Sequence, residues 1–320
     1  MRAREILTAI ILITVSSCAT FEPKSDKQES DPVAVRYAPG TRCMPRYVVD
    51  PSTVNNKSDM RRAMVDHYWD NFNFDADSLV VEYDTIDICQ AMADYVTLIE
   101  PERADSLMRS LMHRAESSRP VLDFFATITA MVLHDPNSPL RHDEYYIPVL
   151  ETLVNSPLLD EYDKLIPAYD LEIALKNRIG HTATDFEYTL SNGRKGRMHD
   201  IEAEYLIVMF TNPGCPMCRE ITEQIIGSPM LNELSEMGLL KIISVYPDAD
   251  IEAWRNYLTE MPANWINSYD KDMVISEQRL YNLNAIPALY LLDSNKRVLV
   301  KDGSDVAFIE HTISLNEIKR

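Results

Sequence analysis

Two cysteines separated by two residues, Cys215 and Cys218, are the side chains in this chain best suited to chemistry. They follow the apolar run 206–210, which predicts a buried strand, and Pro216 lies between them. Proline has no N–H to lose in the first turn of a helix, so the motif predicts Cys215 at a helix N-terminus. Free N–H groups there stabilise a thiolate, and one helical turn keeps the two sulfur atoms within bonding reach. The spacing therefore predicts two-electron exchange between a dithiol and a disulfide.

Two other uses of this cysteine pair are open. A structural zinc site needs four ligands, but the sequence has no second C-x-x-C, and the nearest histidines, His181 and His199, do not have ligand spacing. A permanent structural disulfide is the second alternative, although so tight a loop is usually redox-labile. The residues favour redox use of the pair, and they predict no metal and no cofactor.

A second motif lies downstream, where Ile286 and Pro287 directly precede the apolar run 288–292. With it, the order of elements in residues 179–320 resembles the thioredoxin superfamily, and most closely the membrane-tethered thiol–disulfide oxidoreductases related to TlpA and ResA. The resemblance implies that Cys215 attacks a substrate disulfide and that Cys218 resolves the mixed disulfide. It also implies a cis Ile286–Pro287 bond that presents the Ile286 backbone to the substrate. Because the tethered relatives are mostly reductases, the resemblance favours reduction.

Several positions depart from the pattern of that family. Met209 takes the place of the buried carboxylate of thioredoxin, and Gly214 takes the place of the usual Trp before the motif. The Glu that TlpA-type proteins carry after the second cysteine falls on Ile221, with Glu220 and Glu223 close by. These residues do not fix how protons are handled, nor where the redox potential falls within the range of roughly −270 to −120 mV.

The N-terminus predicts a secretory signal over residues 1–17. Arg2 and Arg4 precede the apolar stretch 6–15, which is too short to span a membrane and ends in small residues before Cys18. This arrangement resembles the lipobox of bacterial lipoproteins, which implies cleavage before Cys18 and lipid attached to it. Several acyl chains on one residue anchor a protein firmly. Ala19 rather than Asp after the cysteine favours the outer membrane, so the chain is expected in the cell envelope, facing the periplasm or the surface.

Between the signal and the C-terminal module, two segments are expected. Residues 18–57 are rich in charged residues, Ser and Pro, which predicts a tether between the lipid and the folded body. Residues 58–177 predict an all-helical domain, because apolar residues recur at helical spacing. One such helical face carries Ile88, Met92, Tyr95 and Ile99. The segment resembles an uncharacterised helical domain that precedes thioredoxin-like modules in lipoproteins of anaerobes.

Residues 178–320 predict an α/β thioredoxin-like domain in which helices flank a mixed sheet, following the all-α domain. The expected strands are 186–190, 196–201, 205–211, 240–245, 288–293 and 298–301. The expected helices are those that open at Cys215 and Pro229, together with 251–258, 275–283 and 306–318. Strands that alternate with helices and end in a hairpin favour this class of fold.

Two further cysteines, Cys43 and Cys89, have open roles. Cys43 lies in a turn-rich segment and Cys89 on an apolar helical face. They form a possible structural disulfide, but a buried thiol at Cys89 is equally ordinary, and the sequence does not give the distance between them.

The chain of 320 residues has a formal net charge of −19, which argues against nucleic-acid binding because phosphates need a basic patch. The expected partners are disulfide-containing envelope proteins, an upstream electron donor, and the membrane through the lipid anchor. The alternative function is a binding or scaffold lipoprotein whose thioredoxin-like domain does no chemistry. Partner binding that depends on the redox state of the cysteine pair is a third possibility.

Overall fold

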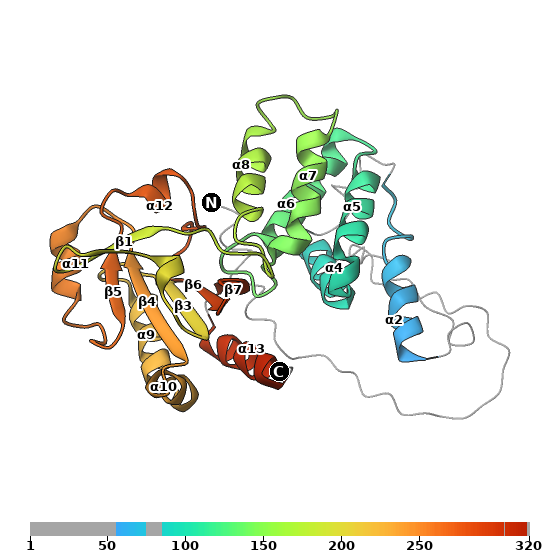
Figure 1. The fold of residues 1–320 in the computed structure, drawn as a ribbon. Coiled ribbons are helices and arrows are strands. Elements are labelled where there is room, and N and C mark those ends of the chain that lie inside the picture. Colours follow the sequence, from blue (N-terminus) through green and yellow to red (C-terminus); the bar gives the residue numbers. More distant parts are fainter. Residues whose placement is uncertain (1–55, 75–84, 304, 319–320) are drawn as a thin grey trace. The chain divides into compact units, whose positions relative to one another are not determined.

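The computed structural model describes residues 56–74, 85–303 and 305–318. It divides into two compact units, residues 1–160 and 161–320, called here the helical unit and the sheet unit (Figure 1). The predicted signal, Cys18 and Cys43 lie outside the described residues. Lipidation, most of the tether and the Cys43–Cys89 bridge therefore stay predictions.

The described part of the helical unit is built from helices, as its apolar periodicity predicts. Their bounds are α2 Lys57–Asp66, α4 Thr85–Leu98, η2 Pro101–Arg103, α5 Ala104–Ala115, α6 Arg119–Leu133 and α7 Asp143–Asn155. Its core contains an aromatic cluster, in which the Trp69 ring meets Phe125 edge-on with 5.4 Å between centroids and also packs against Tyr95. Cys89 on α4 is buried in this unit.

The sheet unit holds a seven-stranded sheet in the order β2-β1-β5-β4-β3-β6-β7. The strands are β1 Glu187–Leu190, β2 Lys195–Arg197, β3 Tyr205–Phe210, β4 Leu240–Tyr246, β5 Ile266–Tyr269, β6 Ala288–Asp293 and β7 Val298–Gly303. The central strands β3, β4 and β5 are parallel, whereas β6 pairs with β3 in the antiparallel sense. The mixed sheet and the flanking helices confirm the predicted class of fold (Figure 1).

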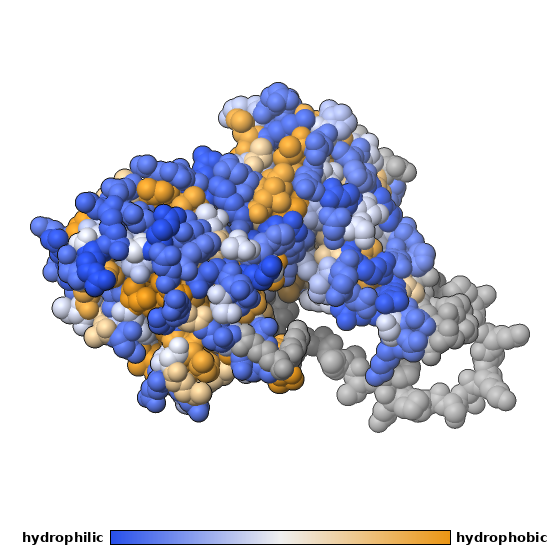
Figure 2. Space-filling view, viewed as in Figure 1, coloured by the Kyte–Doolittle hydropathy of each residue, from blue (hydrophilic) through white to orange (hydrophobic). Residues whose placement is uncertain are grey.

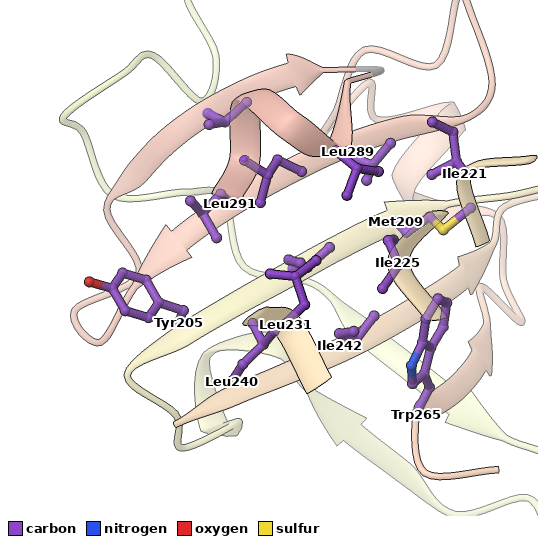
Figure 3. Packing of buried hydrophobic residues seen from close by; sticks show 14 of the residues in the cluster. Tyr205, Met209, Ile221, Ile225, Leu231, Leu240, Ile242, Trp265, Leu289 and Leu291 are labelled. Carbon is purple, nitrogen blue, oxygen red and sulfur yellow. The ribbon is translucent and has the colours of Figure 1, made fainter. Parts of the chain in front are cut away.

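Helices cover the sheet and make two apolar layers. The helices that contribute to these layers are η3 Met198–Asp200, α9 Pro216–Gly227, α10 Pro229–Glu236, α11 Ile251–Tyr257, α12 Val274–Glu277 and α13 Val306–Ile318, and the unit also contains α8 Leu165–Ala174. Side chains alternate across β3, so Ile207 and Met209 join a core with α9 and α13, while Val208 and Phe210 join the core on the opposite face. All of β3 is buried for this reason. Figure 3 shows Met209 in the first of these cores, near Ile221 of α9.

Three local expectations were wrong in detail. Strand β5 was not predicted; its residues Asn267 and Ser268 are polar, yet Ser268 is fully buried and its hydroxyl donates to the Ser244 carbonyl oxygen at 2.8 Å. The helix expected over 275–283 is only one turn, since Arg279 adopts a left-handed φ of 50°. A strand was expected over 196–201, but strand β2 ends at Arg197, and the chain continues from there as the short helix η3.

Helix α8 belongs to the sheet unit, although its residues precede the boundary expected at 178. The Lys301 ammonium donates to the carbonyl oxygens of Ala174 and Lys176, at 2.8 and 2.6 Å. Asn177 donates to the Leu280 carbonyl oxygen at 2.8 Å, and the Arg279 guanidinium lies 4.5 Å above the Tyr169 ring. These contacts attach the C-terminal end of α8 to the sheet unit.

The surface of the molecule is mostly hydrophilic on the face drawn in Figure 2, as its acidic composition requires. Within the described residues, no helix is both long and apolar enough to cross a membrane.

Candidate active site

Cys215 lies where the central strand β3 passes into helix α9. The connecting turn contains Gly214 with φ of +74°, a backbone conformation that glycine adopts without steric cost. Cys215 is the N-cap of α9, and Pro216 occupies the first turn, as the sequence predicts. The Cys218 backbone N–H donates to the Cys215 Sγ at 3.1 Å. A hydrogen bond of this kind at a helix N-terminus stabilises a thiolate, so the position suits a nucleophile.

The Cys215 sulfur is partly exposed and faces the second predicted motif. The Ile286–Pro287 peptide bond is cis, and Pro287 directly precedes β6. The Cys215 Sγ lies 3.7 Å from the Ile286 carbonyl oxygen, close enough for the thiol to donate to it. Strand β6 pairs with β3, and this pairing brings the two motifs together across 71 residues of sequence.

Cys218 lies one turn further along α9 and is fully buried. Burial raises the pKa of the Cys218 thiol to about 12, and the hydrogen bond with Cys215 acts in the same direction. The Asn212 backbone and the Thr211 side chain lower the pKa of Cys218 through hydrogen bonds, but only in part. The two cysteines are therefore in different environments, one accessible and one sealed.

The position of the family's buried carboxylate is apolar here. Met209 is fully buried in the same cluster as Cys218 and Ile221, and it lies near Ile221 of α9 in Figure 3. Glu220 and Glu223, which flank the place of the TlpA-type Glu, are both exposed. Neither glutamate therefore takes the place of a buried carboxylate beneath Cys218.

Two hydroxyl groups that the sequence did not single out lie beside Cys218. Thr211 is the residue after β3 and Tyr257 is the last residue of α11; both are buried. Their oxygen atoms are 3.4 Å apart. Burial raises the pKa of the Tyr257 phenol, so it keeps its proton at neutral pH. The one sequence feature that points to this pair of hydroxyl groups is the position of Thr211, four residues before Cys215.

The remaining predicted residues give no competing site. Within the residues that the structure describes, no group of three or more His, Cys, Asp or Glu side chains is placed to hold a metal ion. The Nε2 atom of His199 lies 2.8 Å from the Ala183 carbonyl oxygen. Trp265 is buried in the same core as Cys218.

A mixed sheet with a C-x-x-C at the helix after its central strand, facing a cis-proline turn, defines a thioredoxin-like protein. Residues 203–298 match the family described as thioredoxin-like, and residues 20–177 match a domain of unknown function, DUF5106. A crystal structure of a thioredoxin-like protein from Bacteroides caccae is 36% identical, with a TM-score of 0.80. The match covers 85% of this chain and 98% of that one. The chain therefore belongs to the thioredoxin-like proteins that carry a helical DUF5106 domain before the thioredoxin-like domain.

Curated relatives match about a third of this chain. Human nucleoredoxin is 29% identical over 114 residues, which covers 35% of this chain and 26% of nucleoredoxin. Nucleoredoxin of Danio rerio is 30% identical over 104 residues, covering 32% of this chain and 24% of its own length. The chain thus spans about a quarter of the length of these relatives. The fold and the family support a redox type of function and are consistent with an oxidoreductase.

Proposed function

We propose that this chain is a lipid-anchored thiol–disulfide oxidoreductase of the cell envelope that acts mainly as a reductase. The observation that carries the proposal is the geometry of the two cysteines. The Cys215 Sγ is partly exposed, accepts a hydrogen bond from the helix N-terminus, and lies 3.7 Å from the Ile286 carbonyl oxygen. Cys218 is buried behind it. One exposed and one buried sulfur suit a nucleophile and a resolving thiol.

The reaction consists of two thiol–disulfide exchanges. The Cys215 thiolate attacks one sulfur of a substrate disulfide, the S–S bond breaks, and the other substrate sulfur leaves as a thiolate that takes up a proton. Cys218 loses its proton and attacks the Cys215 Sγ, which releases the second substrate thiolate and leaves a Cys215–Cys218 disulfide. Two electrons have then passed to the substrate, and an upstream dithiol donor must return them.

The substrates in this proposal are disulfide-containing envelope proteins. The backbone at Ile286 and Pro287 lies beside the nucleophile, where an extended substrate segment can pair with it as an added strand. Placement in the envelope rests on the sequence, since Cys18 follows a signal-like segment and resembles a lipobox. Ala19 after that cysteine favours anchoring to the outer membrane, facing the periplasm or the surface.

Trapping of mixed disulfides tests the proposal. In a Cys218→Ser variant, the resolving step is blocked, so Cys215 should hold substrates as adducts that a small dithiol releases. The Cys215→Ser variant is the matched control, because it keeps Cys218 and Cys89 but lacks the nucleophile. Adducts from envelope extracts that need Cys215 support the proposal, whereas an empty trap would falsify it.

The direction of the reaction is tested by the redox midpoint of the cysteine pair. Titration in dithiol buffers, with alkylation measured by mass, should give a reversible midpoint near the thioredoxin end of the range, about −270 mV. A midpoint near about −120 mV would make the protein an oxidant. A pair that stays oxidised until the protein unfolds would make the bond structural.

A binding or scaffold lipoprotein is the second candidate function. The buried Cys218 favours it, because its pKa of about 12 and the apolar Met209 beneath it slow the resolving step. On this alternative, the double variant Cys215→Ser/Cys218→Ser behaves as the wild type in capture of envelope partners. Loss of capture in the double variant would exclude it.

A further inference from the structure

The segment that leads to Ile286 lies outside helices and strands, although it supplies the backbone beside the nucleophile. Residues 281–287 form no regular element between α12 and β6. Pairing with β3 begins at Ala288, which lies opposite Phe210. The Ile286 carbonyl oxygen nevertheless lies 3.7 Å from the Cys215 Sγ. Contacts made by side chains must therefore help to hold this segment in place.

Asn282 is a buried polar residue of this segment, with an exposed fraction of only 4%. Its Nδ2 atom donates to the Asp302 carboxylate at 3.0 Å, and its Oδ1 atom accepts from the Asn284 backbone N–H at 3.1 Å. Both the donor and the acceptor of the amide are thus used, as a buried amide requires. The amide ties the segment to β7 and also fixes Asn284, two residues before Ile286.

Asp302 lies where β7 departs from regular pairing. Leu289 of β6 pairs with Gly303, whereas Leu291 pairs with Val300, so β7 contains one residue more than β6 over this stretch. A bulge of this kind changes the direction of a side chain. Asp302 also has a left-handed φ of 49°, which is unfavourable for a residue other than glycine. Such a conformation persists only where the surrounding structure holds it, and it is common at functional sites.

We propose that the Asn282–Asp302 hydrogen bond positions the Ile286 backbone for an extended peptide, and so gives the protein a preference for peptide disulfides over small ones. The inference rests on the proposed function, because it concerns the substrates of the first exchange. Asn282 and Asp302 are positioning residues, since they act through Ile286.

Small and peptide disulfides make different demands on this site. A small disulfide needs only the Cys215 Sγ, which is partly exposed. A peptide disulfide also pairs its backbone with Ile286, and this binding contributes to the rate of the first exchange. A segment released from β7 should therefore lose the contribution of the peptide and keep the reaction with the small disulfide.

Two substrates with the same leaving group test the inference on the full chain in its reduced form. One is N-acetylcysteine amide joined by a disulfide to a nitrothiobenzoate group, and the other is a short Ser- and Thr-rich peptide whose central cysteine carries the same group. The Cys215 thiolate attacks the cysteine sulfur of either substrate, the S–S bond breaks, and the coloured aromatic thiolate leaves. Stopped-flow absorbance gives a rate constant for each substrate, and the ratio of the two constants measures the contribution of the peptide.

Asp302→Gly and Asp302→Asn separate the hydrogen bond from the backbone conformation. Glycine adopts the left-handed φ freely but offers no acceptor, so Asp302→Gly should lower the peptide rate constant about three- to tenfold and leave the small-disulfide constant unchanged. Asparagine tolerates this φ and keeps an acceptor oxygen, so Asp302→Asn should retain the wild-type ratio. Asn282→Ala removes the bond from the other side and should resemble Asp302→Gly. Ser268→Ala is the matched control, since it removes the buried 2.8 Å hydrogen bond to the Ser244 carbonyl oxygen within the same sheet.

The inference is overturned if the wild type does not prefer the peptide, or if Asp302→Gly keeps the wild-type ratio. It is also overturned if Asp302→Gly slows both substrates equally, or if Ser268→Ala changes the ratio as much. If Asp302→Gly does not fold, the same results with Asn282→Ala have the same force. A wild type that reacts with neither substrate would instead refute the proposed function itself.

Discussion

The apolar site beneath the cysteines makes a quantitative prediction for Met209→Asp, which places a carboxyl group where the family has one. Met209 is fully buried among Ile221, Ile225 and Leu289 (Figure 3). Loss of a buried Met side chain costs about 2–5 kcal/mol of the free energy of unfolding. The new carboxyl finds no cationic partner among the described members of this cluster, so it stays neutral in the folded state.

Keeping that carboxyl neutral adds a cost that depends on pH. The unfolded chain releases the proton above pH ~3.9, while the folded protein retains it, so the unfolded state gains stability as pH rises. At about 1.36 kcal/mol per pH unit, the cost is about 4 kcal/mol at pH 7 and about 1.5 kcal/mol at pH 5. The variant should therefore recover between 2 and 3 kcal/mol, roughly, when the pH is lowered from 7 to 5.

Urea unfolding at both pH values measures this difference, with Met209→Leu as the matched control. The control keeps the apolar volume, so it should cost less than about 1.5 kcal/mol at either pH. An equal loss of stability for Met209→Asp at pH 5 and pH 7 would refute the reasoning, because it would mean that the site is hydrated or that the carboxyl ionises there.

Three further predictions follow from single contacts. Gly214→Ala should cost about 1 kcal/mol or more in urea unfolding, because φ is +74° while nothing lies within 4 Å of the added methyl; an unchanged stability would contradict it. In Cys215→Ser, alkylation of Cys218, followed by peptide mass, should still increase with pH above neutrality, because burial, the largest cause of the raised pKa of this thiol, does not depend on Cys215; a plateau near neutral pH would speak against a sealed thiol. Ser268→Ala should lower the free energy of unfolding by about 1 kcal/mol through loss of the bond to the Ser244 carbonyl oxygen, and chemical denaturation checks this.

The elements that carry the cysteine pair could be predicted because local patterns define them. The apolar run before Cys215 and the Pro in the first turn gave β3 and α9, and Ile286-Pro287 marked the start of β6. The contact between Cys215 and Ile286 followed from the resemblance to the family, since it spans 71 residues of sequence. Local periodicity carries no information about such a pairing.

The features that escaped prediction depend on tertiary contacts. Strand β5 has polar residues inside the sheet, and only its pairing with β4 and β1 shows that Ser268 is buried. Thr211 and Tyr257 are 46 residues apart, and each is an ordinary residue at the end of its element. Their meeting depends on how α11 packs against the sheet, which no short-range pattern specifies.

The contacts of α8 bear on where a fragment that holds the sheet unit should begin. A fragment that begins at residue 178 would lose Ala174 and Lys176, the two acceptors of the Lys301 ammonium, and the Tyr169 ring beneath Arg279. Lys301 would then lose these two hydrogen bonds. A fragment that begins at residue 161 keeps all of these contacts. Helix α8 thus lies within the residues that match DUF5106 and is attached to the sheet unit by its C-terminal end.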